Sequence, residues 1–89
     1  MTNTIEIKST LLRMSELLYD GDQAFWGNIL SKILLDIDNG SIDTKARIQN
    51  LFGGMGSLND VALYKNGHIM REEGLELMTL SEKLFDLTK

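Results

Sequence analysis

The chain has 89 residues, of which 43% are hydrophobic and 25% are charged, and it carries a formal net charge of −4. This length allows one hydrophobic core, so we expect a single domain over residues 1–89. The acidic balance and the scattered Lys and Arg residues argue against nucleic acid and an anionic membrane surface as partners, and they favour a basic protein. Disulfides and thiolate metal sites are excluded because the chain has no cysteine.

The amino-terminal stretch MTNTIEIKSTLLRM has neither a basic leader nor an uninterrupted apolar run, so it does not have the pattern of a signal peptide. No apolar run approaches the roughly 20 residues that a membrane-spanning helix needs. We therefore expect a cytoplasmic protein.

A first helix is predicted to end at the Asp-Gly pair of residues 20–21. Asn3 and Glu6 have the spacing of a capping box, and apolar residues then recur at helical intervals. This stripe consists of Ile7, Leu11, Met14 and Leu18. A second apolar row recurs every seven residues on another side of the helix: Ile5, Leu12 and Tyr19. The second row fits either a contact surface or scattered apolar exposure.

A second, central helix is predicted from Asp22, as its N-cap, to the Asn-Gly pair of residues 39–40, which suits a left-handed C-cap. Its apolar stripe is broad and contains Phe25, Trp26, Ile29, Leu30, Ile33, Leu34 and Ile37. Leu35 points away from this stripe and is expected on the surface. Ser41 can then cap a third, shorter helix over residues 42–52.

Asn66 and Gly67 lie between two short apolar segments and predict a type I′ β-hairpin. The alternative for residues 58–65 is a short helix capped by Ser57. A last helix is expected from Glu72, with an apolar stripe of Leu77, Leu80, Leu84 and Leu87, flanked by Met78 and Phe85. This helix fits a groove between the first two helices or a dimer seam.

The predicted fold class is therefore α+β and mostly helical, with a three-helix core, a short β-hairpin and a C-terminal helix packed across the others. The alternative is an all-α four-helix bundle, which would follow if residues 58–65 were helical.

The sequence offers few combinations of residues that could support catalysis. His68 is the only histidine, and it is expected as a solvated cross-strand neighbour of Lys65. The stretch DIDNGSID at residues 36–43 fails as a calcium loop, because placing Gly40 at the sixth position puts Ala46 where a bidentate Glu is required. We expect no enzyme activity, no bound metal and no cofactor.

The stretch LFGGMGSLND at residues 51–60 is unusual for its three glycines. Glycines at successive positions can expose amide groups as an anion nest, but no lysine follows them as in a phosphate-binding loop. Three glycines exceed what a helix cap needs. We therefore expect the backbone here to approach another segment closely, either within the chain or in a partner.

The run FGGMGSLNDVAL, together with Trp26, resembles a family of small bacterial domains of unknown function that carry a GGMGS-type loop followed by Asn-Asp. The resemblance implies a bacterial cytoplasmic origin and no particular reaction. It draws attention to a set of candidate partner-binding residues: Gly53, Gly54, Met55, Gly56, Ser57, Asn59 and Asp60.

These observations favour a small acidic protein–protein interaction module, of which a toxin-neutralising or other inhibitory protein is one form. One alternative is a small-molecule or anion-binding domain that uses the backbone amides of Gly53 to Ser57. The other alternative is a homodimeric scaffold built on the last helix.

Overall fold

The computed structural model describes all of the chain except residues 1, 41, 53–57 and 59–60. The described elements are, in order, α1 (Thr2–Asp20), α2 (Ala24–Asp38), α3 (Thr44–Gln49), β1 (Tyr64–Lys65), β2 (His68–Ile69) and α4 (Arg71–Leu87). This architecture confirms the predicted α+β, mostly helical fold. No helix among the described residues is long and apolar enough to span a membrane.

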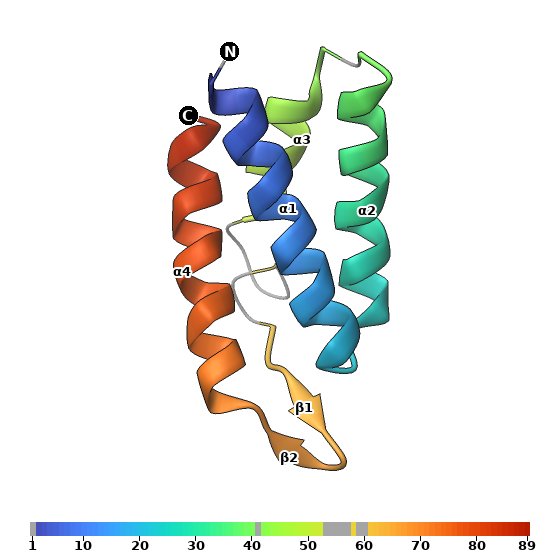
Figure 1. Ribbon diagram of the computed structural model, residues 1–89, viewed down its shortest axis with the longest axis vertical. Helices are drawn as coiled ribbons and strands as arrows, with labels where there is room; N and C mark the ends of the chain where they lie inside the picture. The colour runs from blue at the N-terminus through green and yellow to red at the C-terminus, as the bar shows by residue number, and fades with distance from the viewer. Residues whose placement is uncertain (1, 41, 53–57, 59–60) are drawn as a thin grey trace.

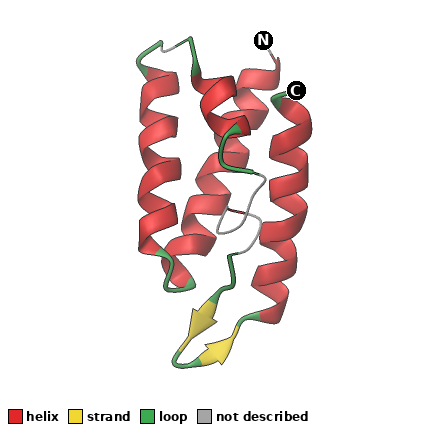
Figure 2. Cartoon of the chain, turned by 180° about the vertical axis from the view of Figure 1, so that it is seen from behind, coloured by secondary structure: helices red, strands yellow, loops and turns green. Residues whose placement is uncertain are grey.

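α1 is the central helix of the molecule, with α2 on one side and α4 on the other (Figure 1). α3 lies behind these three helices and faces the viewer when the molecule is seen from the back (Figure 2). The predicted α1 stripe is fully buried, and Leu17 joins it. The expectation of a central second helix was wrong, because α1 is the helix with a packed neighbour on each side. α4 lies beside α1 and away from α2, so it does not occupy a groove between the first two helices.

Three predicted helix starts were also wrong. α1 begins at Thr2, so Asn3 lies inside the helix and cannot be its N-cap. α2 begins at Ala24, and Asp22 has a φ of 64°. A residue in this left-handed conformation ends the preceding helix and does not begin the next one. α3 covers only Thr44–Gln49 and follows Asp43, while Ser41 lies outside the described residues.

Other features of α2 follow the sequence more closely. Gly40 has a φ of 84° and ends the helix as predicted, since its amide donates to the carbonyl of Ile37 at 3.0 Å. Leu35 is exposed, as expected. Phe25 was wrongly assigned to the buried stripe and is 70% exposed, where it meets the half-buried ring of Trp26 edge-on.

The hairpin is confirmed in both its position and its turn. Asn66 and Gly67 have φ values of 54° and 81°, which a type I′ turn requires. The register pairs Tyr64 with Ile69 and Lys65 with His68, so His68 is the exposed cross-strand neighbour that was predicted.

The chain before the hairpin crosses directly over the turn between α1 and α2. The Tyr64 amide donates to the Gly21 carbonyl at 2.9 Å, and the Gln23 side chain donates to the Ala62 carbonyl at 2.8 Å. Between them, Leu63 is 1% exposed and lies against Gly21. A Cβ atom on Gly21 would stand 2.6 Å from the Leu63 Cβ atom, so the backbone must be bare at this point. The close approach predicted for the glycine-rich stretch concerns Gly53, Gly54 and Gly56, which lie outside the described residues.

Gly21→Ala should lower the free energy of unfolding by about 1–3 kcal/mol, because the added methyl group overpacks a buried contact with Leu63. Gly74→Ala is the matched control. Among the described residues, nothing lies within 4 Å of a Cβ atom at Gly74, which is helical. Alanine should therefore raise the free energy of unfolding by about 0.5–1 kcal/mol through its better helix propensity. Urea unfolding measures both changes, and an equal effect of the two substitutions would contradict the Gly21 contact.

α4 is attached to α1 by a bidentate ion pair between Arg13 and Glu76. The Arg13 Nε atom lies 2.7 Å from Glu76 Oε2, and Nη2 lies 3.0 Å from Oε1. The hydrogen bond from Arg13 holds the pKa of Glu76 below its ordinary value. At the other end, the Gln49 side chain donates to the Thr88 hydroxyl at 2.5 Å and to the Phe85 carbonyl at 3.0 Å, which links α3 to α4.

Because Glu76 has a lower pKa in the folded state than in the unfolded state, its contribution to stability is present above its ordinary pKa. This contribution is lost as the pH falls through the lowered value. Urea unfolding at a series of pH values should show that Glu76→Gln is less stable than the native chain at neutral pH and that the difference disappears in acid. Arg13→Gln should remove the same acid-sensitive part. A difference that stays constant across the pH range would contradict this assignment.

Candidate functional site

The candidate residues of the glycine-rich stretch, 53–57 and 59–60, lie outside the described residues, but the two positions that bracket and interrupt them are described. Phe52 is half-buried, and its ring meets that of Phe85 edge-on with centroids 5.7 Å apart. Leu58 is 2% exposed, and its amide donates to the Leu51 carbonyl at 2.9 Å. Phe52 and Leu58 therefore place the borders of this stretch beside α4.

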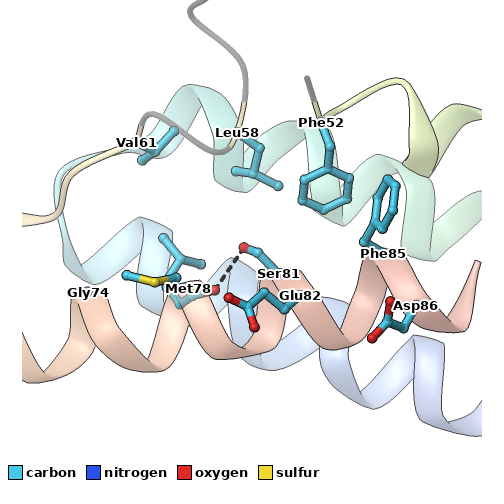
Figure 3. Close-up of a pocket in the computed structure, with 10 residues that line it drawn as sticks. Phe52, Leu58, Val61, Gly74, Met78, Ser81, Glu82, Phe85 and Asp86 are labelled. Carbon is cyan, nitrogen blue, oxygen red and sulfur yellow. Dashed lines mark hydrogen bonds between the residues drawn. The ribbon is translucent and has the colours of Figure 1, made fainter. Parts of the chain in front are cut away.

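A groove with a volume of about 860 Å³ lies between α4 and the segment that contains these two residues. Figure 3 shows Phe52, Leu58 and Val61 on one wall and Met78, Ser81, Glu82 and Phe85 on the other. Gly74, Leu77 and Asp86 complete its lining. Residues distant in sequence thus form one largely apolar depression, here called the α4 groove.

The outer face of α4 carries apolar side chains that the fold leaves in solvent. Leu75 is 62% exposed, Met78 is 55% exposed and Phe85 is 36% exposed. Phe85 lies nearest to the buried stripe of Leu77 and Leu84, and Met78 and then Leu75 lie farther round the helix toward solvent. The α4 groove and this exposed row form a continuous surface, since Met78 and Phe85 belong to both.

Gly74 forms one end of the α4 groove and lies in the first turn of α4. Its φ is outside the left-handed region, and no atom of the described residues lies within 4 Å of a Cβ atom placed there. Neither the backbone conformation nor a contact in the described part of the chain therefore requires glycine here, although glycine weakens a helix. The missing side chain leaves the groove open at this end.

The polar groups that line the groove are few, and those with charge are acidic. The Ser81 hydroxyl donates to the Leu77 carbonyl at 2.8 Å, so its proton is used within the helix (Figure 3). Glu82 makes no ion pair with the described residues. Asp86 lies 3.3 Å from the ammonium of Lys89, which also stands 5.5 Å from the centre of the Phe85 ring. Glu82 thus gives this surface a negative group, while the charge of Asp86 is balanced by Lys89.

Neither of the metal or catalytic candidates from the sequence forms a site. Asp36 is within α2 and is paired with Arg47 and Lys32, and the hydrogen bond from Arg47 lowers its pKa. His68 is exposed on β2. Across the described residues, no group of three or more His, Cys, Asp or Glu side chains is arranged to hold a metal ion.

Sequence reasoning missed the roles of Gly74, Glu82 and Asp86 in the groove. The signal that could have found the site was the surplus apolar surface of the last helix, where Met78 and Phe85 were noted beside the buried stripe. What the sequence alone did not supply was the opposite wall, to which Phe52, Leu58 and Val61 contribute.

Comparison with known proteins found no match among curated proteins or solved structures. The family described as Domain of unknown function (DUF6966) matches residues 20–71, from the end of α1 to the start of α4. This region contains the groove wall formed by Phe52, Leu58 and Val61, while the α4 wall lies beyond it. The expectation of a domain family of unknown function is confirmed. Because the match covers more than half of the residues, the chain belongs to the DUF6966 family.

Proposed function

We propose that this protein is a non-catalytic protein-binding module whose α4 groove receives an apolar segment of a basic partner. The observation that carries the proposal is the continuity of the α4 groove with the exposed side chains of Leu75, Met78 and Phe85. A groove that contains aromatic and methionine side chains and is bordered by charge is typical of protein recognition surfaces.

Charge supports the choice of a basic partner. Glu82 and Asp86 border the groove, and the chain as a whole carries a net charge of −4. Complementary charge speeds association and excludes wrong partners. A toxin-neutralising or inhibitory role is one form of this proposal, since a basic toxin would meet an acidic surface. The bacterial and cytoplasmic setting implied by the sequence resemblance belongs to the same proposal.

The lining of the groove favours a protein segment over a small polar molecule. Small-molecule sites combine apolar walls with a few convergent polar groups that fix the orientation of the ligand. Here the Ser81 proton is already donated within α4, and the charged groups are two carboxylates that would repel an anion. An anion site on the amides of Gly53 to Ser57 stays a separate prediction, because those residues lie outside the described part of the chain.

Affinity capture with matched variants tests the proposal. Met78→Glu removes an apolar contact from the groove and would bury a carboxylate against the apolar segment of the partner. The Met78 side chain is 55% exposed, so the fold should be retained. Capture of the partner should fall at least about tenfold, as for a central interface residue. The control is Ile69→Glu, which adds the same charge at an apolar side chain 57% exposed on β2. Quantitative mass spectrometry should find basic proteins retained by the native chain and by the control but lost with Met78→Glu. Equal capture by all three baits would contradict the proposal.

A second prediction uses the glycine at the end of the groove. Gly74→Leu should leave the free energy of unfolding unchanged or higher, because no atom of the described residues lies within 4 Å of the added Cβ atom and leucine favours a helix. The same substitution should weaken binding of the captured partner, since the side chain fills the open end of the groove. Calorimetric titration measures affinity and thermal unfolding measures stability. Unaltered affinity would show that the partner does not approach Gly74.

A further inference from the structure

The polar side chains of the α4 groove can accept hydrogen bonds but have no proton left to donate. Among the described residues that line the groove, these side chains are Ser81, Glu82 and Asp86. Carboxylates accept only, and the hydroxyl proton of Ser81 is already donated to the Leu77 carbonyl at 2.8 Å. A ligand that forms a hydrogen bond with these side chains must therefore supply the proton.

Ser81 is the polar residue that the groove encloses. It is 8% exposed and belongs to the buried stripe of α4. Figure 3 shows its hydroxyl between Met78 and Phe85, on the wall that faces Leu58. A hydroxyl oxygen has two lone pairs, and no described residue donates a hydrogen bond to this one. The floor of the groove thus holds an acceptor that lies beside apolar side chains.

The walls on either side of this acceptor favour an aromatic ring. Phe52 and Phe85 both line the groove, and their rings meet edge-on with centroids 5.7 Å apart. A further ring can pack on such a pair in the same edge-to-face geometry. Met78 adds a thioether to the lining, and contacts between sulfur and aromatic rings are favourable.

Tryptophan is the side chain that combines an aromatic ring with a donor and no acceptor. Its indole ring is apolar, and its Nε1–H group can only donate. Phenylalanine has no donor, and tyrosine adds an oxygen whose lone pairs find no donor among the side chains described here. Lysine and arginine also donate only, but their charge would have to be desolvated at the floor of the groove.

We propose that the segment received by the α4 groove carries a tryptophan whose indole N–H donates to the Ser81 hydroxyl oxygen. This inference rests on the proposed function and names the chemistry of the partner at the same site. A lysine or arginine next to the tryptophan then meets the exposed Glu82, which has no ion pair with the described residues. The chain's own Trp26 packs against the hydrophobic core, so a second copy does not supply the indole.

Two capped tripeptides that differ only in the donor test the hydrogen bond. The first has tryptophan between two lysines. In the second, benzothienylalanine replaces tryptophan, so that a sulfur atom stands in place of the indole N–H. NMR titration of the isotope-labelled full chain should show the second peptide binding about three- to tenfold more weakly, which is the ratio expected for one hydrogen bond between neutral groups.

Matched variants of α4 identify the acceptor. Ser81→Ala should bind the two peptides with equal affinity, because the oxygen that distinguishes them is gone. Thr79→Ala is the control, since the exposed Thr79 hydroxyl donates to the Leu75 carbonyl at 3.1 Å in the same way but does not line the groove. This control should keep the native preference for tryptophan. Circular dichroism should confirm that both variants remain helical.

Equal affinity of the native chain for the two peptides would overturn the tryptophan assignment. So would a preference that persists in Ser81→Ala or disappears in Thr79→Ala, or the absence of shifts at Met78 with either peptide at millimolar concentration. The proposed function fails separately, if Met78→Glu captures the partner as well as the native chain does. Capture that depends on Met78, together with equal binding of the two peptides, would keep the groove as a binding site and reject tryptophan as its ligand.

Discussion

The contact between Gly21 and Leu63 is the constraint on which the arrangement of the molecule depends. It fixes residues 62–64 over the turn that joins α1 to α2, where the Gln23 side chain and the Gly21 carbonyl hold them. The hairpin follows directly. α4 begins at Arg71, two residues after β2 ends at Ile69. The direction and starting point of α4 are therefore set by this crossing.

The α4 groove follows from the same arrangement. α4 packs against α1 with one stripe, and Phe52, Leu58 and Val61 face it across the groove on its other side. Ion pairing between Arg13 and Glu76 and the hydrogen bonds of Gln49 fix α4 at points along its length. Since the helix is held in this way, Met78 and Phe85 stay at the surface instead of turning inward. The exposed row is a result of the packing and not of a loose helix.

The parts of the fold that could be predicted are those encoded by local pattern. The α1 stripe and the α4 stripe recur at helical spacing, and both are packed in the core. Asn66-Gly67 predicted the hairpin because few other pairs accept two positive φ values in succession. The N-caps predicted at Asn3 and Asp22 were wrong, because such side chains suit several backbone conformations. Their spacing alone does not decide which conformation the fold selects.

The parts that could not be predicted depend on contacts between distant segments. Gly21 follows a helix and so resembles an ordinary terminator, and only the arrival of Leu63 explains why a side chain is not accommodated there. Phe25 fits the α2 stripe by spacing, but no neighbouring element covers that part of the helix. The groove likewise needs two walls from separate regions of the chain, of which the sequence made only the α4 wall visible.

The crossing at Gly21 also bears on how the chain folds. α1 and α2 are neighbours in sequence and can pair through short-range contacts, which form rapidly. The hydrogen bond from the Tyr64 amide to the Gly21 carbonyl instead joins residues that are far apart in the chain. Closing such a loop costs conformational entropy before stabilising contacts can form. The bare backbone at Gly21 gives Leu63 a place to settle once the first two helices have met. We therefore expect the rate-limiting step of folding to be the arrival of residues 62–64 on that preformed helical pair.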